Sequence, residues 1–279
     1  MGYVAYSSGR PSDNGPDSAS QPERPGPLRS SHLRDPAAKR AYNVRLFSVV
    51  APKYHFVTRF LSFDRDRHWK DELLSMLPDG EAHEVLDIAC GPGDLTFRLA
   101  RKYPAGSVTG VDISPEMLSA AEAARRRRVA SERRGISFDH VTFTRADMGS
   151  LPFPDARFSA VTGGYALRNA PDLAATLDEL HRVMKPGGWA VFLEFSRTSL
   201  RALQPLQYRL LRFWGNLWGR VFHGDPNVYG YIARTMRAFP PRREFHRMLR
   251  ARGFVAVRDR RLLMGFLAIT VCRNPRATQ

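Results

Sequence analysis

The chain has 279 residues, 43% of them hydrophobic, and a formal net charge of +16 at pH 7. This length suits one larger α/β domain with accessory segments, not two independent cores. Its two cysteines, Cys90 and Cys272, are too few for a disulfide framework. No apolar run approaches the ~18–20 residues that a membrane-spanning helix needs. The composition therefore excludes a disulfide-stapled secreted domain and favours a cytoplasmic protein.

The positive charge is concentrated in the C-terminal third. Residues 1–35 are neutral, and residues 36–196 hold 22 basic and 20 acidic residues. Residues 197–279 hold 17 arginines against three acids, which gives +14. Such a region attracts polyanions, either an anionic membrane surface or a nucleic acid. An arginine-rich composition spread over solvated faces is the alternative, and both interpretations stay open.

Residues 1–35 are rich in Ser, Pro, Gly and Asp, and we predict that this N-terminal tail is disordered. It contains no apolar segment of the kind that a secretory signal has. Helical periodicity then runs from Lys39 to Leu77, with a break at Ala51-Pro52. Residues 36–83 are predicted to form an N-terminal helical lid.

Alternating strands and helices are predicted from residue 84 to about 196. The predicted strands are 84–89, 107–112, 140–145, 157–163 and 189–195, and the predicted helices are 94–102, 115–130 and 172–184. This alternation indicates a parallel sheet with helices on both faces. Pro186-Gly187-Gly188 is expected to end the last of these helices and begin the fifth strand. A helical insert at about 199–240, a helix at 241–252 and an antiparallel pair at 253–261 and 263–272 complete a domain over 84–279.

The stretch Glu84–Gly93 is an apolar strand that ends in the turn Gly91-Pro92-Gly93. Glycines let a backbone approach a ligand, and the helix that follows directs free N–H groups toward it. The second strand ends in Asp112, an acid placed to hold a ribose diol. The glycine spacing resembles the D-x-x-x-G-x-G loop of class I S-adenosylmethionine methyltransferases, with Asp87 as its first residue.

That resemblance implies S-adenosyl-L-methionine as the cofactor and no metal. Asp112 would take the ribose hydroxyls, while Asp147 and Met148, after the third strand, would take the adenine. Gly164 would border the methionine part. The full set of implied cofactor-binding residues is Asp87, Gly91, Pro92, Gly93, Asp112, Asp147, Met148 and Gly164. As alternatives, a two-glycine turn can be only a tight turn, and Asp147 can be only a turn cap.

A more specific likeness begins at Arg182–Ser196, which resembles the second hallmark of the ubiquinone/menaquinone biosynthesis C-methyltransferases. Gly164–Asn169 resembles the G-L-R-N segment of that family, and Asn227–Pro240 resembles its late tyrosine-containing stretch. The likeness covers roughly residues 40–273. The first hallmark, Y-D-x-M-N-x-x-x-S-x-x-x-H-x-x-W, is kept only in part. The kept residues are Tyr54, Ser62 and Trp69, and the changed ones are His55, Val57, Thr58 and Asp66.

The family resemblance implies a Rossmann-like α/β fold with about seven strands, the last antiparallel, and helical lids before the first strand and after the fifth. It implies C-methylation of a polyprenylated quinol, either demethylmenaquinol to menaquinol or the 2-methoxy-6-polyprenyl-1,4-benzoquinol step. The altered first hallmark keeps another phenolic, polyketide or terpenoid acceptor as the alternative. An RNA-binding methyltransferase is less favoured, because no N-P-P-Y-type tetrapeptide follows the fourth strand. A scaffold that binds the cofactor without turnover also stays open.

Arg168 and Asn169 are the candidate catalytic residues. Carbon methylation requires a ring hydroxyl to lose its proton, and Arg168 could stabilise the developing phenolate, with Asn169 beside it as a hydrogen-bonder. A guanidinium keeps its proton, so Arg168 is not itself the base. The alternative is a structural ion pair of Arg168 with Glu194 or Asp172. His55 is a candidate base, although a lone histidine in a lid is more often a packing or surface residue.

The segment Leu200–Phe222 has a basic amphipathic helical pattern with aromatic residues at its borders. Such a helix can lie in a membrane interface, or it can simply cover a core as a lid. The implied substrate is a polyprenyl quinol that resides in the membrane. We therefore expect a cytoplasmic protein that is peripheral on the inner face of the membrane, through residues 197–279. Nucleic acid is not an expected partner, and a homodimer is left open.

Overall fold

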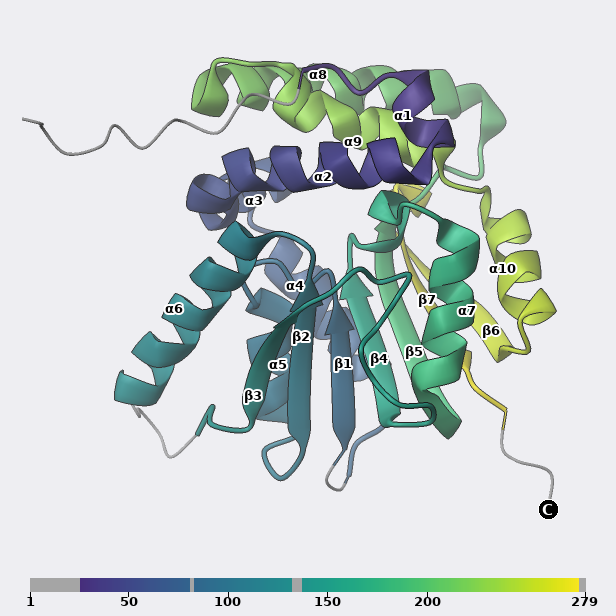
Figure 1. Cartoon of the computed structure of the whole chain (residues 1–279). Coiled ribbons are helices and arrows are strands. Elements are labelled where there is room, and N and C mark those ends of the chain that lie inside the picture. Colours follow the sequence, from purple (N-terminus) through teal and green to yellow (C-terminus); the bar gives the residue numbers. More distant parts are fainter. Residues whose placement is uncertain (1–25, 81–82, 132–136, 276–279) are drawn as a thin grey trace, which may run out of the picture.

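A seven-stranded sheet with the order β3-β2-β1-β4-β5-β7-β6 forms the centre of the molecule (Figure 1). The computed structural model describes residues 26–80, 83–131 and 137–275. The strands are β1 (Glu84–Ile88), β2 (Ser107–Asp112), β3 (Val141–Arg145), β4 (Phe158–Gly164), β5 (Met184–Phe195), β6 (Val255–Leu262) and β7 (Leu267–Arg273). β1 to β5 pair in parallel, whereas β7 pairs antiparallel with both β5 and β6. The predicted Rossmann-like fold with a reversed last strand is confirmed.

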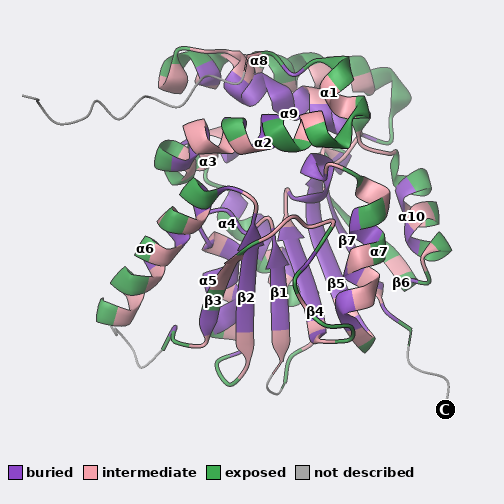
Figure 2. Cartoon of the chain, in the orientation of Figure 1, coloured by how far each residue is buried: buried purple, intermediate pink, exposed green. Residues whose placement is uncertain are grey.

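Helices cover both faces of the sheet. The helices α4 (Asp66–Ser75), α5 (Asp94–Lys102) and α6 (Pro115–Ser131) pack on one face, and α7 (Leu173–Val183) and α10 (Arg242–Ala251) pack on the other. The central strands are buried along most of their length, as Figure 2 shows for β1 and β4. Two apolar cores, one on each face of the sheet, therefore fix the ends of the strands in space.

A helical cap lies across the carboxyl ends of the parallel strands (Figure 1). It consists of α1 (Ser30–Arg34), α2 (Pro36–Val50), α3 (Tyr54–Ser62), α8 (Gln204–His223) and α9 (Asn227–Ala238). Its own core contains Tyr42 and Leu46 of α2 and Tyr229 and Ile232 of α9. The cap therefore brings the segment before the first strand against the segment after the fifth strand, as the two predicted lids require.

Single-turn 3-10 helices join several of these elements. They are η1 (Ala51–Lys53), η2 (Leu167–Asn169), η3 (Arg201–Leu203) and η4 (Leu263–Gly265). η2 follows β4 directly and carries the candidate residues Arg168 and Asn169. The fold thus places these two residues at the carboxyl end of a central strand.

The largest local difference from the prediction concerns β5, which begins at Met184 and not at residue 189. Pro186-Gly187-Gly188 lies inside the strand, where the pairing shifts from Phe158↔Met184 to Ala160↔Trp189. Gly187 adopts φ 80°. Its N–H donates to the carbonyl of Asn274, and the Asn274 N–H donates to the Gly188 carbonyl. The segment is therefore a bulge inside β5 whose backbone stays hydrogen-bonded. α7 already ends at Val183, so Pro186-Gly187-Gly188 is not the signal that ends this helix.

Two further differences concern the N-terminal region. α4 was predicted as part of the lid, but its Trp69 and Leu73 belong to the core on the face of the sheet that α5 and α6 cover. Residues 26–35, predicted to be disordered, contain α1 and the buried Leu28, whose carbonyl accepts from Arg234. The prediction of disorder is wrong there because Leu28 packs into the cap. Residues 1–25 lie outside the described part of the chain.

Candidate active site

A cavity lined by both polar and apolar residues lies between α2 and the carboxyl ends of β1, β2, β3 and β4, and we call it the polar cavity because Asp112, Asp147 and Asn169 line it. Its volume is about 60 Å³. Seven of the residues predicted from sequence line it, together with many that were not predicted. The lining consists of Asn43, Phe47, Tyr54, Ala89, Gly91, Val111, Asp112, Ile113, Met117, Ala146, Asp147, Met148, Gly164, Tyr165, Arg168, Asn169, Pro171 and Tyr231. Segments that are distant in sequence thus meet where the resemblance places the cofactor.

Asp112 connects the glycine turn to the second strand. Its Oδ2 accepts from the Gly91 N–H and its Oδ1 accepts from the Ser114 N–H, each at 2.9 Å. Burial raises the pKa of this carboxyl group, and the backbone hydrogen bonds oppose that shift. Because a carboxylate oxygen can accept more than one hydrogen bond, Asp112 can still accept from a ligand diol in the cavity.

Asp87 lies beneath the turn and does not line the cavity. Thr96 donates to its Oδ2 at 2.7 Å, and Thr162 donates to its Oδ1 at 3.0 Å. Burial raises the pKa of Asp87 to about 7, although both hydrogen bonds lower it. Asp87 therefore joins β1, β4 and α5 below the turn and shapes the site from outside.

The two glycines of the turn, Gly91 and Gly93, differ in what occupies the space where a Cβ would lie. Gly91 lines the cavity with φ +55°, and a Cβ there would meet only Met117 Sδ at 3.9 Å. Gly93 has φ +83° and a Cβ would lie 2.9 Å from Phe97 Cε2. Gly93 and the buried Pro92 are absent from the lining. Gly91 thus leaves room for a ligand, whereas Gly93 leaves room for an aromatic side chain.

Helix α2 closes the cavity on the side of Asp147. Arg40 Nε lies 2.5 Å from Asp147 Oδ2, and Asn43 Nδ2 donates to the Asn169 carbonyl at 2.7 Å. The other oxygen of Asp147 accepts from the Gly149 N–H. With α2 in this position the cavity is too small for a nucleoside. An adenine amino group would have to compete with Arg40 for Asp147.

A second cavity, of about 720 Å³, adjoins the first and is mainly apolar. It lies between α3, α8, α9 and the start of β7. Its lining consists of Tyr54, Thr58, Leu61, Ser62, Phe63, Arg65, Trp69, Tyr165, Arg168, Phe195, Leu210, Leu211, Phe213, Trp214, Gly215, Tyr229, Tyr231, Ile232, Leu263, Phe266 and Leu267. Four residues line both cavities, and we call them the shared wall: Tyr54, Tyr165, Arg168 and Tyr231.

Arg168 is buried in the shared wall and paired with Glu194. Its Nη1 lies 2.8 Å from Glu194 Oε1 and donates to the Tyr165 carbonyl, and its Nη2 donates to the Tyr231 hydroxyl at 3.4 Å. The structural ion pair considered from sequence is therefore present. The Nε of Arg168 has no hydrogen-bond partner among the described residues. Arg168 can thus still donate a hydrogen bond within the wall.

Asn169 donates through Nδ2 to the Tyr165 carbonyl at 3.1 Å. Its buried Oδ1 has no hydrogen-bond partner within the described ranges. Leaving a buried acceptor unpaired costs free energy, so a donor from a bound molecule is expected there. His55, the candidate base, lines neither cavity.

Sequence reasoning missed the importance of three tyrosines in the shared wall. Tyr54 and Tyr231 lie in segments that resemble family motifs, but only the fold shows that they meet. Tyr165 and Ala89 have positive φ, 60° and 47°, which is uncommon for residues with a side chain. Both line the polar cavity. Strained residues gather at functional sites, which supports the assignment of this region as the active site.

Comparison with known proteins shows the family of this chain. Residues 36–273 match the sequence model of the ubiE/COQ5 methyltransferase family. The demethylmenaquinone methyltransferase of Anoxybacillus flavithermus (strain DSM 21510 / WK1) is 33% identical over 232 residues, covering 83% of this chain and 94% of that protein. The YcgJ protein of Bacillus subtilis has a TM-score of 0.55 at 18% identity, over 76% of this chain and 100% of that one. A SAM dependent methyltransferase from Aquifex aeolicus has a TM-score of 0.51 at 16% identity, over 74% and 89%. The two structural likenesses concern the fold alone.

Proposed function

The chain belongs to the ubiE/COQ5 methyltransferase family, and on that premise we propose that it methylates a ring carbon of a polyprenylated quinol with S-adenosyl-L-methionine. One observation carries this proposal. A polar cavity at the strand ends and a large apolar cavity meet at the shared wall. The first cavity would take a nucleoside-bearing methyl donor once α2 moves away from Asp147, and the second suits a ring with a long apolar tail.

The polar cavity has the donors and acceptors that S-adenosylmethionine needs. Asp112 would hold the ribose, Asp147 and Met148 the adenine, and Gly91 and Gly164 the backbone-facing side of the ligand. A Cβ at Gly164 would meet only Leu95 Cδ2, at 3.7 Å, so the space beyond this glycine is open. When bound, the cofactor supplies a methyl group whose bond to sulfur breaks as the ring carbon forms the new bond.

The shared wall provides the polar chemistry. Three tyrosines and Arg168 surround the place where the two cavities meet, and Asn169 adds an unpaired acceptor. A reacting phenol needs hydrogen-bond donors for its developing negative charge, and preorganised buried donors are effective for this purpose. We assign Arg168 this stabilising role, with its charge balanced by Glu194.

The apolar cavity opens among exposed apolar side chains. Four of its apolar lining residues are exposed, and we call them the apolar rim: Phe63 (72%), Leu210 (50%), Phe213 (66%) and Leu263 (40%). Met264 beside the rim is 87% exposed. Exposed apolar groups of this kind mark contact surfaces. We infer that the rim rests on the membrane that contains the quinol. None of the helices in the described ranges combines the length and apolar character needed to cross a membrane.

Quinone profiling of a deletion strain tests the proposed substrate. A strain that lacks this gene should accumulate a quinone without the ring methyl group, and the intact gene should restore the methylated form. An unchanged quinone profile would exclude a quinol as the methyl acceptor. It would favour another phenolic acceptor, which the altered first hallmark already suggests.

A further inference from the structure

Asp66 stands where the first hallmark of the family has His, and the structure gives this residue a direct contact with the shared wall. The Tyr165 hydroxyl donates to Asp66 Oδ1 at 3.0 Å. Asp66 is only 7% exposed. Tyr165 lines both cavities, so a buried carboxylate stands one side chain away from the place where the substrate ring is expected.

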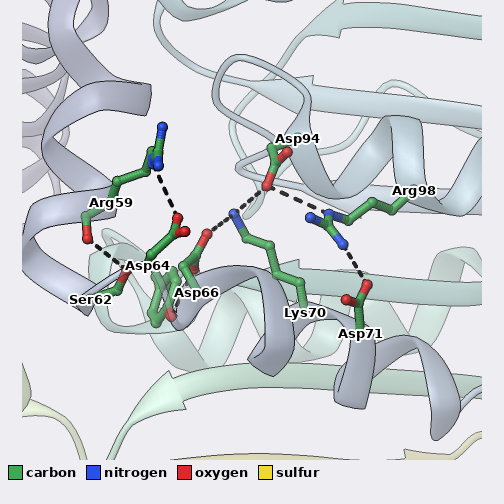
Figure 3. Close-up of polar contacts among 9 residues, drawn as sticks. Arg59, Ser62, Asp64, Asp66, Lys70, Asp71, Asp94 and Arg98 are labelled. Carbon is green, nitrogen blue, oxygen red and sulfur yellow. Dashed lines mark hydrogen bonds and ion pairs between the residues drawn. The ribbon is translucent and has the colours of Figure 1, made fainter.

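The other oxygen of Asp66 is held by a lysine. Lys70 Nζ lies 2.6 Å from Asp66 Oδ2 and 2.7 Å from Asp94 Oδ2, and Figure 3 shows the amine between the two carboxylates. Burial alone would lower the pKa of Lys70, but the charges of Asp66 and Asp94 more than offset this and the net shift is upward. Lys70 therefore stays charged, fixes the Asp66 carboxylate and leaves Oδ1 for Tyr165.

We propose that Tyr165 and Asp66 form a proton relay for the hydroxyl group of the acceptor, with Tyr165 as a catalytic residue and Asp66 as the positioning residue behind it. This inference rests on the proposed function. The Tyr165 oxygen can accept a hydrogen bond from a phenolic hydroxyl while its own proton points to Asp66. Carbon methylation needs such a proton to leave the ring hydroxyl.

The relay moves protons in balanced steps. The acceptor O–H breaks as a new O–H forms on Tyr165, while the original Tyr165 proton passes to Asp66 Oδ1. The electron pair left on the acceptor oxygen enriches the ring carbon that receives the methyl group. That carbon then loses its proton to water, and the phenolate oxygen recovers a proton from Asp66 through Tyr165. Each turnover therefore releases one proton to solvent.

The surroundings of Tyr165 favour a relay over a free tyrosinate. Burial, then the charge of Asp66, raises the pKa of Tyr165 well above its usual value, and only Arg168 opposes this. Tyr54, from α3, adds to this upward shift of the Tyr165 pKa through its charge. Tyr165 therefore keeps a proton at neutral pH. It acts by giving that proton to Asp66 as it takes another.

The first test is the pH dependence of turnover in Tyr165→Phe, which keeps the ring that packs on Phe195. We expect kcat to fall by about 10²- to 10⁴-fold at neutral pH, with cofactor affinity unchanged. The deficit should shrink as pH rises toward about 10, where a phenol ionises without help. Tyr103→Phe is the matched control, because it also removes a buried tyrosine hydroxyl, bound to the Pro78 carbonyl, outside both cavities. An unchanged kcat, or a deficit independent of pH, would overturn the relay.

The second test reads proton transfer without turnover. A prenylated nitrophenol, whose absorbance reports its ionisation, is bound to the full chain at a pH below its solution pKa. The wild type and Asp71→Asn, a control on the same helix that pairs with Arg98, should bind it as the phenolate. Tyr165→Phe and Asp66→Asn should bind it as the neutral phenol, and ionisation in all four proteins would overturn the relay. If the probe behaves as expected but the wild type methylates no quinol, the proposed function fails and the relay stands.

Discussion

Asp87 is a buried carboxyl group whose pKa is raised to about 7 by burial, so its protonation is linked to folding. The folded chain holds this proton more tightly than the unfolded chain, in which the pKa is about 3.9. Stability from this group is therefore full below pH ~4 and is lost as pH rises to about 7. The slope from this one proton is up to about 1.4 kcal/mol per pH unit.

Asp87→Asn should remove that part of the pH dependence. Asparagine can still accept from one threonine and donate to the other, so the variant should fold. Thermal unfolding measured between pH 5 and 8 should show a stability that depends less on pH in the variant. Its gain in stability relative to the wild type should be largest near pH 8. Parallel curves for the two proteins would mean that Asp87 does not carry the linked proton.

A Cβ added at Gly164 and one added at Gly163 would lie on opposite sides of β4, so the two positions give a matched pair of substitutions. Gly164→Ala directs a methyl group toward the polar cavity with only an ordinary contact to Leu95. We expect about tenfold weaker cofactor binding or more by calorimetry, with stability unchanged. Gly163→Ala puts a Cβ 2.9 Å from Ile88 Cγ1 and should cost about 1–3 kcal/mol of stability. Unaltered affinity in Gly164→Ala would place the cofactor elsewhere.

The candidate site could be predicted from sequence only where the residues lie next to a strand end. Asp112, Asp147 and Gly164 each end or follow a parallel strand, so they meet at one edge of the sheet. Gly93 looks like a ligand-facing glycine in the sequence, but Phe97 and Phe143 occupy the space beside it. The contact between Asp66 and Tyr165 spans 99 residues and depends on how α4 docks, so no local pattern indicates it.

Among the elements, α2 controls the polar cavity through Arg40 and Asn43. The Arg40–Asp147 ion pair occupies the group that the adenine would use, and Arg40 is 49% exposed. Arg40→Gln should therefore speed cofactor association up to about fivefold, in line with the small free energy of an exposed ion pair. Stopped-flow binding measures this rate, and Arg45→Gln on the same helix is the control. Equal rates in all three proteins would show that α2 opens without breaking this contact.

Sequence patterns predicted the bounds of some elements correctly. The predicted bounds of α5 and β2, 94–102 and 107–112, are those observed. β5 was misplaced because Pro186-Gly187-Gly188 resembles a helix stop, yet Asn274 supplies the hydrogen bonds that keep it in the sheet. α4 was assigned to the lid because its apolar spacing is the same whether it covers a cavity or a sheet. Contacts with residues distant in sequence determine both the start of β5 and the position of α4.

On the scale of the whole molecule, the charge of residues 197–279 is divided between two surfaces. Arg209, Arg212 and Arg220 are exposed on α8, in the cap. Other arginines lie on α10 and β6 at the far edge of the sheet, where Arg242 and Arg260 lie near Asp259 and Glu72. The first group lies on the same helix as Leu210 and Phe213 of the apolar rim, so we expect the membrane interaction to depend on α8.

Replacing Arg209, Arg212 and Arg220 by Glu should abolish binding to anionic liposomes at low salt. Each basic residue near such a surface contributes about 1 kcal/mol, and salt screens the attraction. Cosedimentation at low and high salt measures the effect, with cofactor affinity expected to stay intact. The control replaces Arg101, Arg126 and Arg127, which are exposed away from the cap. A wild type that ignores anionic liposomes would mean that the charge is compositional and α8 is only a lid.

The central claim is that the shared wall is where a methyl group passes from S-adenosylmethionine to a ring carbon of a prenylated quinol. The most direct measurement supplies the full chain with cofactor carrying a ¹³C-labelled methyl group and with reduced demethylmenaquinone in detergent, and determines by NMR where the label appears. The account predicts a new methyl group on the quinol ring carbon, lost in Gly164→Ala at low cofactor concentration. A label on a ring oxygen, or no label in the quinol from a protein that binds the cofactor, would contradict it.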